Sequence, residues 1–192
     1  MSQKKEIIII DNRDSFTYNL YQLFDEHPLC SVTVVYSDQV KLDDLARYDQ
    51  LVLSPGPDVP RAYPILFDIL ARYEDHKPIL GVCLGHQAIG EYYGATLYNV
   101  EQVFHGQARS LELVTPDLLF QNIADKTQVG LYHSWALAQC DFPKELLITA
   151  VSSDNVLMAF RHQTKNIRGI QFHPESYITT AGRQMIANWI EQ

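Results

Sequence analysis

The first half of the chain alternates short apolar runs with stretches of helical periodicity. Four runs are apolar on successive positions, as expected for strands that are covered on both faces: residues 6–10, 31–36, 50–54 and 78–82. Between them, apolar residues recur at helical spacing and predict helices near 15–26 and 62–73, the first with Asp14 or Ser15 as its cap. This alternation predicts βαβ units stacked into a parallel sheet.

The second half carries shorter strand patterns separated by turn residues. The candidate strands are residues 97–104, 108–114, 128–132, 147–152, 156–161 and 167–172. A final helix near 179–191 has an apolar face made of Met185, Ile186, Trp189 and Ile190. We therefore expect an α/β fold with an open, mostly parallel twisted sheet, flanked by helices and extended by antiparallel strands. No linker or repeat is visible, so residues 1–192 are expected to form one domain.

Composition narrows the class of protein. Hydrophobic residues make up 46% and charged residues 20% of the 192 positions, and the longest aliphatic run, residues 7–10, is too short for a membrane span. The net charge is −8, without a dense Lys/Arg block, so we expect no nucleic-acid partner. The cysteines at 30, 83 and 140 are odd in number and form no C-x-x-C pair. These features predict a cytoplasmic protein that contacts no membrane.

The most informative stretch is Gly-Val-Cys-Leu-Gly at residues 81–85, where an apolar strand meets a helical pattern. Cys83 lies two residues from a glycine on either side, which is the pattern of a nucleophile elbow. The N–H groups at the start of a helix favour a thiolate there. The alternative is an inert cysteine in a tight turn. Cys30 and Cys140 lack such a setting and are expected to be packing residues.

A cysteine nucleophile needs a base, and the base needs an orienting group. Pro174 favours an extended conformation at His173, and residues two apart in an extended chain project to the same side. Glu175 is therefore expected beside the His173 ring. Histidines without such a neighbour are more often structural, and we interpret three in this way: His27, His76 and His162. No histidine pair has metal-ligand spacing with acidic support, so we expect no metal site.

The segment Ser-Pro-Gly-Pro at residues 54–57 closes the third predicted strand. Its two prolines withhold N–H groups and force an open loop around Gly56. Loops at the carboxyl ends of parallel strands share a crevice, so the N–H groups of Gly56 and Leu84 are candidates for one oxyanion hole. The alternative is a plain rigid turn.

These motifs, taken in order, resemble those of the class I (triad) glutamine amidotransferases, in particular the small subunits of anthranilate synthase and aminodeoxychorismate synthase. The resemblance spans nearly the whole chain. The segments that carry it are residues 11–20 (DNRDSFTYNL), 53–57 (LSPGP), 81–87 (GVCLGHQ), 132–134 (YHS) and 169–176 (GIQFHPES). The first segment resembles the chorismate-using branch more than the GMP, carbamoyl-phosphate or CTP branches.

The resemblance implies a set of roles at these positions. Cys83 would attack the side-chain amide carbon of glutamine, His173 would pass a proton to the departing ammonia, and Glu175 would orient His173. Gly56 and Leu84 would be the oxyanion donors. Further residues implied to contact glutamine are Gly56 itself, Pro57, Asp58, Gln87, Ser134 and Trp135. Water would then hydrolyse the γ-glutamyl thioester.

The resemblance also implies a partner. Ammonia would pass through a channel to a larger synthase subunit that binds chorismate and Mg²⁺, in a heterodimer or heterotetramer, while the small subunit needs no cofactor. Three positions depart from the family pattern: Asp58 where a glycine or small residue is usual, Gln107 where lysine is common, and Trp135 in place of an aliphatic residue.

Two other functions and the identity of the product stay open at this point. The same residues would suffice for a stand-alone thiol hydrolase of γ-glutamyl compounds, or for a regulatory subunit that has lost turnover. Within the leading hypothesis, the product is anthranilate, 4-amino-4-deoxychorismate, or both through one shared small subunit.

Overall fold

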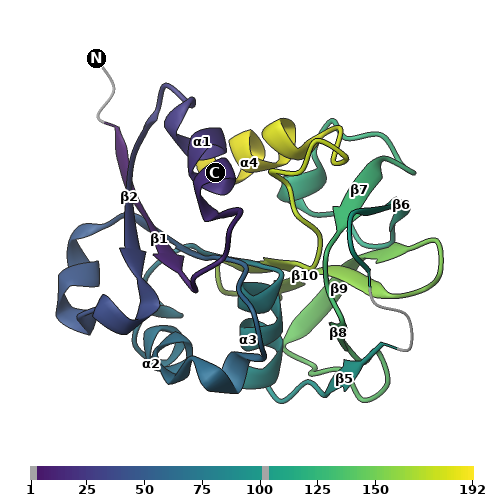
Figure 1. Ribbon diagram of the computed structural model, residues 1–192, viewed down its shortest axis with the longest axis horizontal. Helices are drawn as coiled ribbons and strands as arrows, with labels where there is room; N and C mark the ends of the chain where they lie inside the picture. The colour runs from purple at the N-terminus through teal and green to yellow at the C-terminus, as the bar shows by residue number, and fades with distance from the viewer. Residues whose placement is uncertain (1–3, 101–103) are drawn as a thin grey trace.

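A computed structural model describes residues 4–100 and 104–192 (Figure 1). The main sheet has nine strands in the order β2-β1-β3-β4-β11-β10-β9-β6-β7. Their bounds are β1 (Lys5–Asp11), β2 (Cys30–Tyr36), β3 (Gln50–Leu53), β4 (Ile79–Val82), β6 (Gln107–Leu113), β7 (Gln128–Leu131), β9 (Leu146–Ser152), β10 (Leu157–His162) and β11 (Ile167–Ile170). A separate antiparallel pair consists of β5 (Leu97–Asn99) and β8 (Trp135–Leu137).

The pairing divides the main sheet into two parts. Strands β2, β1, β3, β4 and β11 are mutually parallel, whereas β11-β10-β9-β6-β7 pair antiparallel. In β1, Ile7 and Ile9 join the core on one face, while Ile8 and Ile10 join the core on the other. Burial on both faces explains the continuous apolar run, and it confirms the predicted mostly parallel sheet with antiparallel additions.

Helices cover both faces of this sheet. They are α1 (Thr17–Asp25), α2 (Pro64–Tyr73), α3 (Leu84–Tyr92) and α4 (Gly182–Ile190), with short 3₁₀ turns η1 (Ser37–Gln39), η2 (Leu42–Arg47), η3 (Pro60–Ala62) and η4 (Leu118–Phe120). Helices α1 and α4 lie side by side on one face, where the rings of Phe24 and Trp189 are 5.9 Å apart (Figure 1). Helices α2 and α3 pack together on the opposite face. The apolar face predicted for the last helix is buried on the α1 side of the sheet.

Two local predictions were wrong. Helix α1 begins later than expected, and neither Asp14 nor Ser15 caps it; Asp14 instead accepts the Phe16 N–H (2.8 Å) in the turn before the helix. The strand predicted at 97–104 ends at Asn99 and pairs with β8 outside the main sheet, while residues 101–103 of that prediction lie outside the described residues. Strand β8, only three residues long, was too short for its pattern to be distinguished from a loop.

The two cysteines expected to be packing residues differ from one another. Cys30 is buried, and burial raises the pKa of its thiol to about 11. Cys140 is exposed, so its assignment to the core was wrong. It lies shortly after β8, in the turn that leads to Asp141.

None of the helices formed by residues 4–100 and 104–192 is both long enough and apolar enough to cross a membrane.

Candidate active site

Cys83 occupies the turn between β4 and α3. Its backbone has φ 51° and ψ −103°, a conformation that residues with a side chain rarely adopt. The Cys83 N–H donates to the carbonyl of Ile170 in β11 (2.8 Å), and its carbonyl accepts the N–H of Gln87 (3.0 Å). The sheet and the helix thus hold Cys83 in a strained conformation from both sides, as a nucleophile at an elbow requires.

The two glycines that flank Cys83 are required because neighbouring backbone atoms lie too close for a side chain. A Cβ on Gly81 would lie 2.4 Å from the carbonyl oxygen of Gly85, and a Cβ on Gly85 would lie 2.2 Å from the carbonyl oxygen of Leu53. Both distances are far inside van der Waals contact. The absence of side chains therefore lets the start of α3 pack against the end of β3, which confirms the tight strand-to-helix turn predicted here.

His173 and Glu175 form a buried pair next to this elbow. The Nδ1 of His173 lies 2.6 Å from Oε1 of Glu175, and the side chains are 3% and 0% exposed. The contact was predicted, but the reason given for it was wrong. The chain does not continue extended: the N–H of Ser176 donates to the His173 carbonyl (3.2 Å), and this turn brings Glu175 back to the ring.

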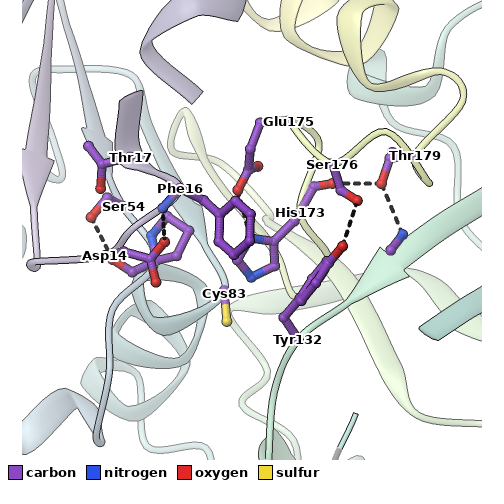
Figure 2. Close-up of polar contacts among 12 residues, drawn as sticks. Asp14, Phe16, Thr17, Ser54, Cys83, Tyr132, His173, Glu175, Ser176 and Thr179 are labelled. Carbon is purple, nitrogen blue, oxygen red and sulfur yellow. Dashed lines mark hydrogen bonds and ion pairs between the residues drawn. The ribbon is translucent and has the colours of Figure 1, made fainter. Parts of the chain in front are cut away.

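The environment of His173 favours its charged form. Burial lowers the pKa of the ring, but the charge of Glu175 and the nearby Cys83 side chain outweigh burial and raise the pKa well above its ordinary value. The Nε2 atom is buried, and no residue in the described part of the chain gives it a hydrogen bond of ordinary geometry. The sulfur of Cys83 lies near this side of the ring (Figure 2), so the arrangement can hold a proton beside the sulfur.

Side chains from other segments fix the ring of His173. The rings of Phe16 and Tyr132 lie 5.9 Å and 5.1 Å from it and 5.3 Å from each other, so the three rings form one cluster beside Glu175 and Cys83 (Figure 2). The hydroxyl of Thr179 donates to the His173 carbonyl (2.6 Å). Sequence reasoning missed the two aromatic contacts because Phe16 and Tyr132 lie far from His173 along the chain.

The loop after β3 lies at the same edge of the sheet as the elbow. Leu53 pairs with Gly81 across β3 and β4, so the loop begins next to the Cys83 turn. Asn12 holds the loop: its Nδ2 donates to the Ser54 carbonyl (2.9 Å), and a Cβ on Gly56 would lie 2.6 Å from the Asn12 Cβ. This placement is compatible with Gly56 and Leu84 as oxyanion donors, which stay predictions.

Asp58 has a backbone conformation that favours glycine. Its φ is +72°, in the left-handed region where glycine is strain-free. Its carboxylate accepts the N–H of Val59 (3.0 Å) and the residue is exposed. Pro57, its neighbour, accepts the hydroxyl of Tyr63 through its carbonyl (3.1 Å). The turn thus prefers glycine, the residue that the resemblance makes usual at this position.

The remaining residues that were predicted to contact glutamine form hydrogen bonds within the protein. The side-chain nitrogen of Gln87 donates both to the Trp135 carbonyl (2.9 Å) and to Oε1 of Gln171 (3.0 Å). The Ser134 carbonyl accepts the N–H of Val100 (2.8 Å). Gln171 was missed by sequence reasoning. Its signal was a polar residue at the end of an otherwise apolar run, where a buried amide needs a partner.

Gln107, at a position where the resemblance makes lysine common, contacts a neighbouring arginine. Its Oε1 accepts a hydrogen bond from the Arg109 guanidinium (3.0 Å), which also pairs with Asp154. A cation therefore lies against Gln107, although glutamine itself carries none. Across the described residues, no group of three or more His, Cys, Asp or Glu side chains is arranged to hold a metal ion.

Replacing Glu175 with glutamine is expected to reverse the pKa shift of His173. The amide keeps an oxygen near Nδ1 but removes the charge that outweighs burial, so the NMR titration midpoint of the ring should fall below about 6.5. Turnover should drop roughly 10²- to 10⁴-fold, because the ring no longer holds its proton and orientation. A midpoint that stays high would contradict the role of Glu175.

Glu175→Gln should also reverse the direction in which the stability of the fold changes with pH. In the wild type, the raised folded-state pKa stabilises the protein below the unfolded-state value, and this contribution is lost as pH rises through the folded-state pKa. In Glu175→Gln, the folded-state pKa is depressed, so stability should instead increase as pH rises toward the unfolded-state value. Urea unfolding at several pH values, with the exposed Glu112→Gln as control, measures both slopes.

Comparison with known proteins gives the family. The profile described as glutamine amidotransferase class-I matches residues 8–192. A Haemophilus influenzae protein provisionally named anthranilate synthase component II is 43% identical, with 96% of this chain and 95% of that protein covered. Anthranilate synthase component 2 of Pseudomonas aeruginosa is 37% identical (97% and 95% covered), and aminodeoxychorismate synthase component 2 of Escherichia coli is 36% identical (97% and 100%).

Solved structures agree on the fold. A Thermoplasma acidophilum protein provisionally described as a GMP synthase subunit superimposes with a TM-score of 0.89 at 23% identity, covering 100% of this chain and 94% of that one. A Thermotoga maritima glutamine amidotransferase gives 0.72 at 20% identity, with 98% and 82% covered. With the family profile spanning almost the full sequence and the relatives matching end to end, the chain belongs to the class I glutamine amidotransferases.

Proposed function

We propose that this chain releases ammonia from glutamine through a thioester on Cys83 and delivers it to a chorismate-binding synthase subunit. The observation that carries the proposal is the position of Cys83 at a strained elbow, beside the buried His173–Glu175 pair. A merely structural cysteine would need neither the strain nor the charged neighbour.

The geometry supports a two-stage reaction. The Cys83 thiolate attacks the side-chain amide carbon of glutamine, and the N–H groups of Gly56 and Leu84 stabilise the oxyanion. His173 donates its proton to the departing nitrogen, so ammonia leaves and the γ-glutamyl thioester forms. Water then attacks the thioester while His173 accepts its proton, and glutamate leaves with the sulfur restored as thiolate. Glu175 stabilises the imidazolium in both stages.

The names of the relatives support the partner. Those proteins are second components of anthranilate synthase or of aminodeoxychorismate synthase, so we propose a larger synthase subunit that binds chorismate and Mg²⁺. This chain would supply ammonia and no cofactor.

Cysteines 30, 83 and 140 are free in the described structure, which supports a reducing, cytoplasmic location.

Reconstitution tests the proposed partner. The purified chain is mixed with a first component of each synthase, and formation of anthranilate or 4-amino-4-deoxychorismate from chorismate is measured with glutamine and, in parallel, with ammonium salt. We expect glutamine to support amine formation only when this chain is present. Amine formation from ammonium but not from glutamine, with both first components, would contradict the proposal.

Two further assays separate the alternatives. A diazo-ketone glutamine analogue should alkylate Cys83, as shown by mass spectrometry of the complex; absence of the adduct would favour a silent regulatory subunit. Hydrolysis of γ-glutamyl peptides by the isolated chain, faster than glutamine turnover in the complex, would favour a stand-alone hydrolase. Low glutaminase activity of the isolated chain would support neither alternative, because partner contact can complete an oxyanion loop.

Asp58 should weaken glutamine binding, since its exposed charge lies on the loop proposed to contact a substrate that carries a carboxylate. We expect Asp58→Gly to lower the KM for glutamine about 2- to 5-fold, the size of a solvent-screened like-charge repulsion. Asp58→Asn should lower the KM to the same extent. Only the glycine variant should also gain stability, by about 1 kcal/mol, because it relieves the positive φ. An unchanged or raised KM in Asp58→Gly would refute the effect.

A further inference from the structure

A pair of buried amides lies against the sulfur of Cys83. The side-chain nitrogen of Gln171 is 3.5 Å from Sγ of Cys83, and the Gln171 oxygen accepts from the nitrogen of Gln87 (3.0 Å). Gln171 is 0% exposed and Gln87 is 3% exposed. The sulfur thus has the imidazole of His173 as one neighbour and an N–H donor as another.

The backbone of Trp135 decides which end of each amide faces the sulfur. A carbonyl oxygen can only accept, so the amide nitrogen of Gln87 must face the Trp135 carbonyl, 2.9 Å away. The same nitrogen has one more N–H, which meets the oxygen of Gln171. The nitrogen of Gln171 is then left to face Cys83. Reversing either amide would leave buried groups without a complementary partner, which is unfavourable.

The backbones on both sides keep this donor in place. The N–H of Gln171 donates to the carbonyl of Met158 in β10 (2.8 Å), and the N–H of Cys83 donates to Ile170 in β11 (2.8 Å). Donor and sulfur therefore follow neighbouring strands of one sheet and cannot drift apart without breaking these hydrogen bonds. A hydrogen bond to an ionised acceptor is stronger than one to its neutral form, so a fixed N–H beside the sulfur favours the thiolate.

We infer that Gln171 is a positioning residue for the nucleophile: oriented through Gln87 by the Trp135 carbonyl, its amide holds the Cys83 sulfur and stabilises the thiolate before glutamine binds. The inference deepens the proposed function, on which it rests for the reaction that the thiolate performs. The effect of Gln171 on the reactivity of the sulfur is a property of the free protein and can be measured without substrate.

The test measures alkylation of Cys83 by iodoacetamide as a function of pH, without glutamine. All proteins carry Cys140→Ser, because Cys140 is exposed and would react, whereas burial raises the pKa of the Cys30 thiol to about 11 and keeps it in the unreactive protonated form. In Gln171→Met, which keeps the length but removes the donor, the pH midpoint of alkylation should rise by about one unit, the effect of one charge-assisted hydrogen bond. Glutamine turnover in the complex should show kcat lowered about 10-fold with KM changed less than about 3-fold.

Two variants of the amide pair sharpen the result. Gln171→Glu keeps the acceptor for Gln87 and the shape of the side chain, but places a negative charge next to the sulfur, so its midpoint should rise further than that of Gln171→Met. Gln87→Met leaves Gln171 free to rotate and should give a smaller rise. The matched control is Gln184→Met, an exposed amide on α4, which should leave the midpoint unchanged.

Other titratable groups near the site stay the same in every variant. His173 and Glu175 follow β11, and Asp14 lies before α1, with a pKa raised by burial. His133, from the turn between β7 and β8, has its pKa lowered by burial to about 4 and is neutral over the range tested. A shift between variants therefore reports on the amide at 171.

The outcomes are distinguishable. A midpoint that does not move in Gln171→Met and Gln171→Glu, with both proteins shown to be folded by circular dichroism and thermal unfolding, would overturn the inference and leave Gln171 as a packing residue. A midpoint that moves as expected in a protein that never hydrolyses glutamine would support the inference and contradict the proposed function.

Discussion

Replacing Cys83 with serine should lower ammonia release from glutamine by roughly 10⁴-fold or more in the synthase complex. The serine hydroxyl is ionised far less readily than a thiol, and His173 is arranged to hold a proton beside the nucleophile rather than to remove one from an alcohol. Glutamate formation is measured by a coupled dehydrogenase assay. Amine formation from ammonium salt should continue, since that reaction bypasses this chain.

The control for folding uses the strain at this position. Cys83→Gly removes the side chain that makes φ 51° costly, so it should unfold at an equal or higher temperature than the wild type while having no activity. Cys83→Ala keeps the strain and should be the less stable of the two. Ammonia release that survives in Cys83→Ser, with a folded protein, would refute the proposed nucleophile.

Replacing Gly85 with alanine should destabilise the fold by about 3 kcal/mol or more. The added Cβ would lie 2.2 Å from the Leu53 carbonyl oxygen and 2.7 Å from the Leu53 side chain, so the start of α3 would have to move away from β3. The same movement displaces Cys83 from His173, so glutamine turnover should be lost as well. Urea unfolding monitored by tryptophan fluorescence gives the free energy.

Gly94 supplies the matched control. Its φ is +96° but no atom lies within 4 Å of a Cβ placed there, so Gly94→Ala carries the backbone cost alone, about 1 kcal/mol. The difference between the two variants isolates the steric effect at the elbow. If Gly85→Ala were no less stable than Gly94→Ala, close packing of α3 on β3 would not be what fixes the turn.

The candidate nucleophile and its base could be predicted because each depends on neighbours close in sequence. The glycines around Cys83 are two residues away on either side, and the turn that they permit is a local property of the backbone. Glu175 likewise reaches His173 from two residues away. The extended-chain argument for that contact failed because a Pro-containing segment can also turn, and only the hydrogen bond from Ser176 shows which conformation the chain adopts.

The surroundings of the site could not be predicted in this way. Phe16, Tyr132 and Gln171 come from a loop before α1, the end of β7 and the end of β11. Whether these residues lie close together depends on the order of the strands in the sheet. The local pattern of residues does not predict that β11 pairs with β4. The exposed Cys140 was misjudged for the same reason, since a thiol carries no local signal of burial.

The alternation of strands and helices, the elbow at Cys83 and the contact between His173 and Glu175 follow from the order of the residues, because periodicity, glycine spacing and a two-residue separation act locally. The neighbouring positions of β4 and β11, the orientation of Gln87 and Gln171 by the Trp135 carbonyl, and the packing of aromatic rings on His173 follow from the folded chain. Those contacts join residues many positions apart, and packing of the whole sheet selects them.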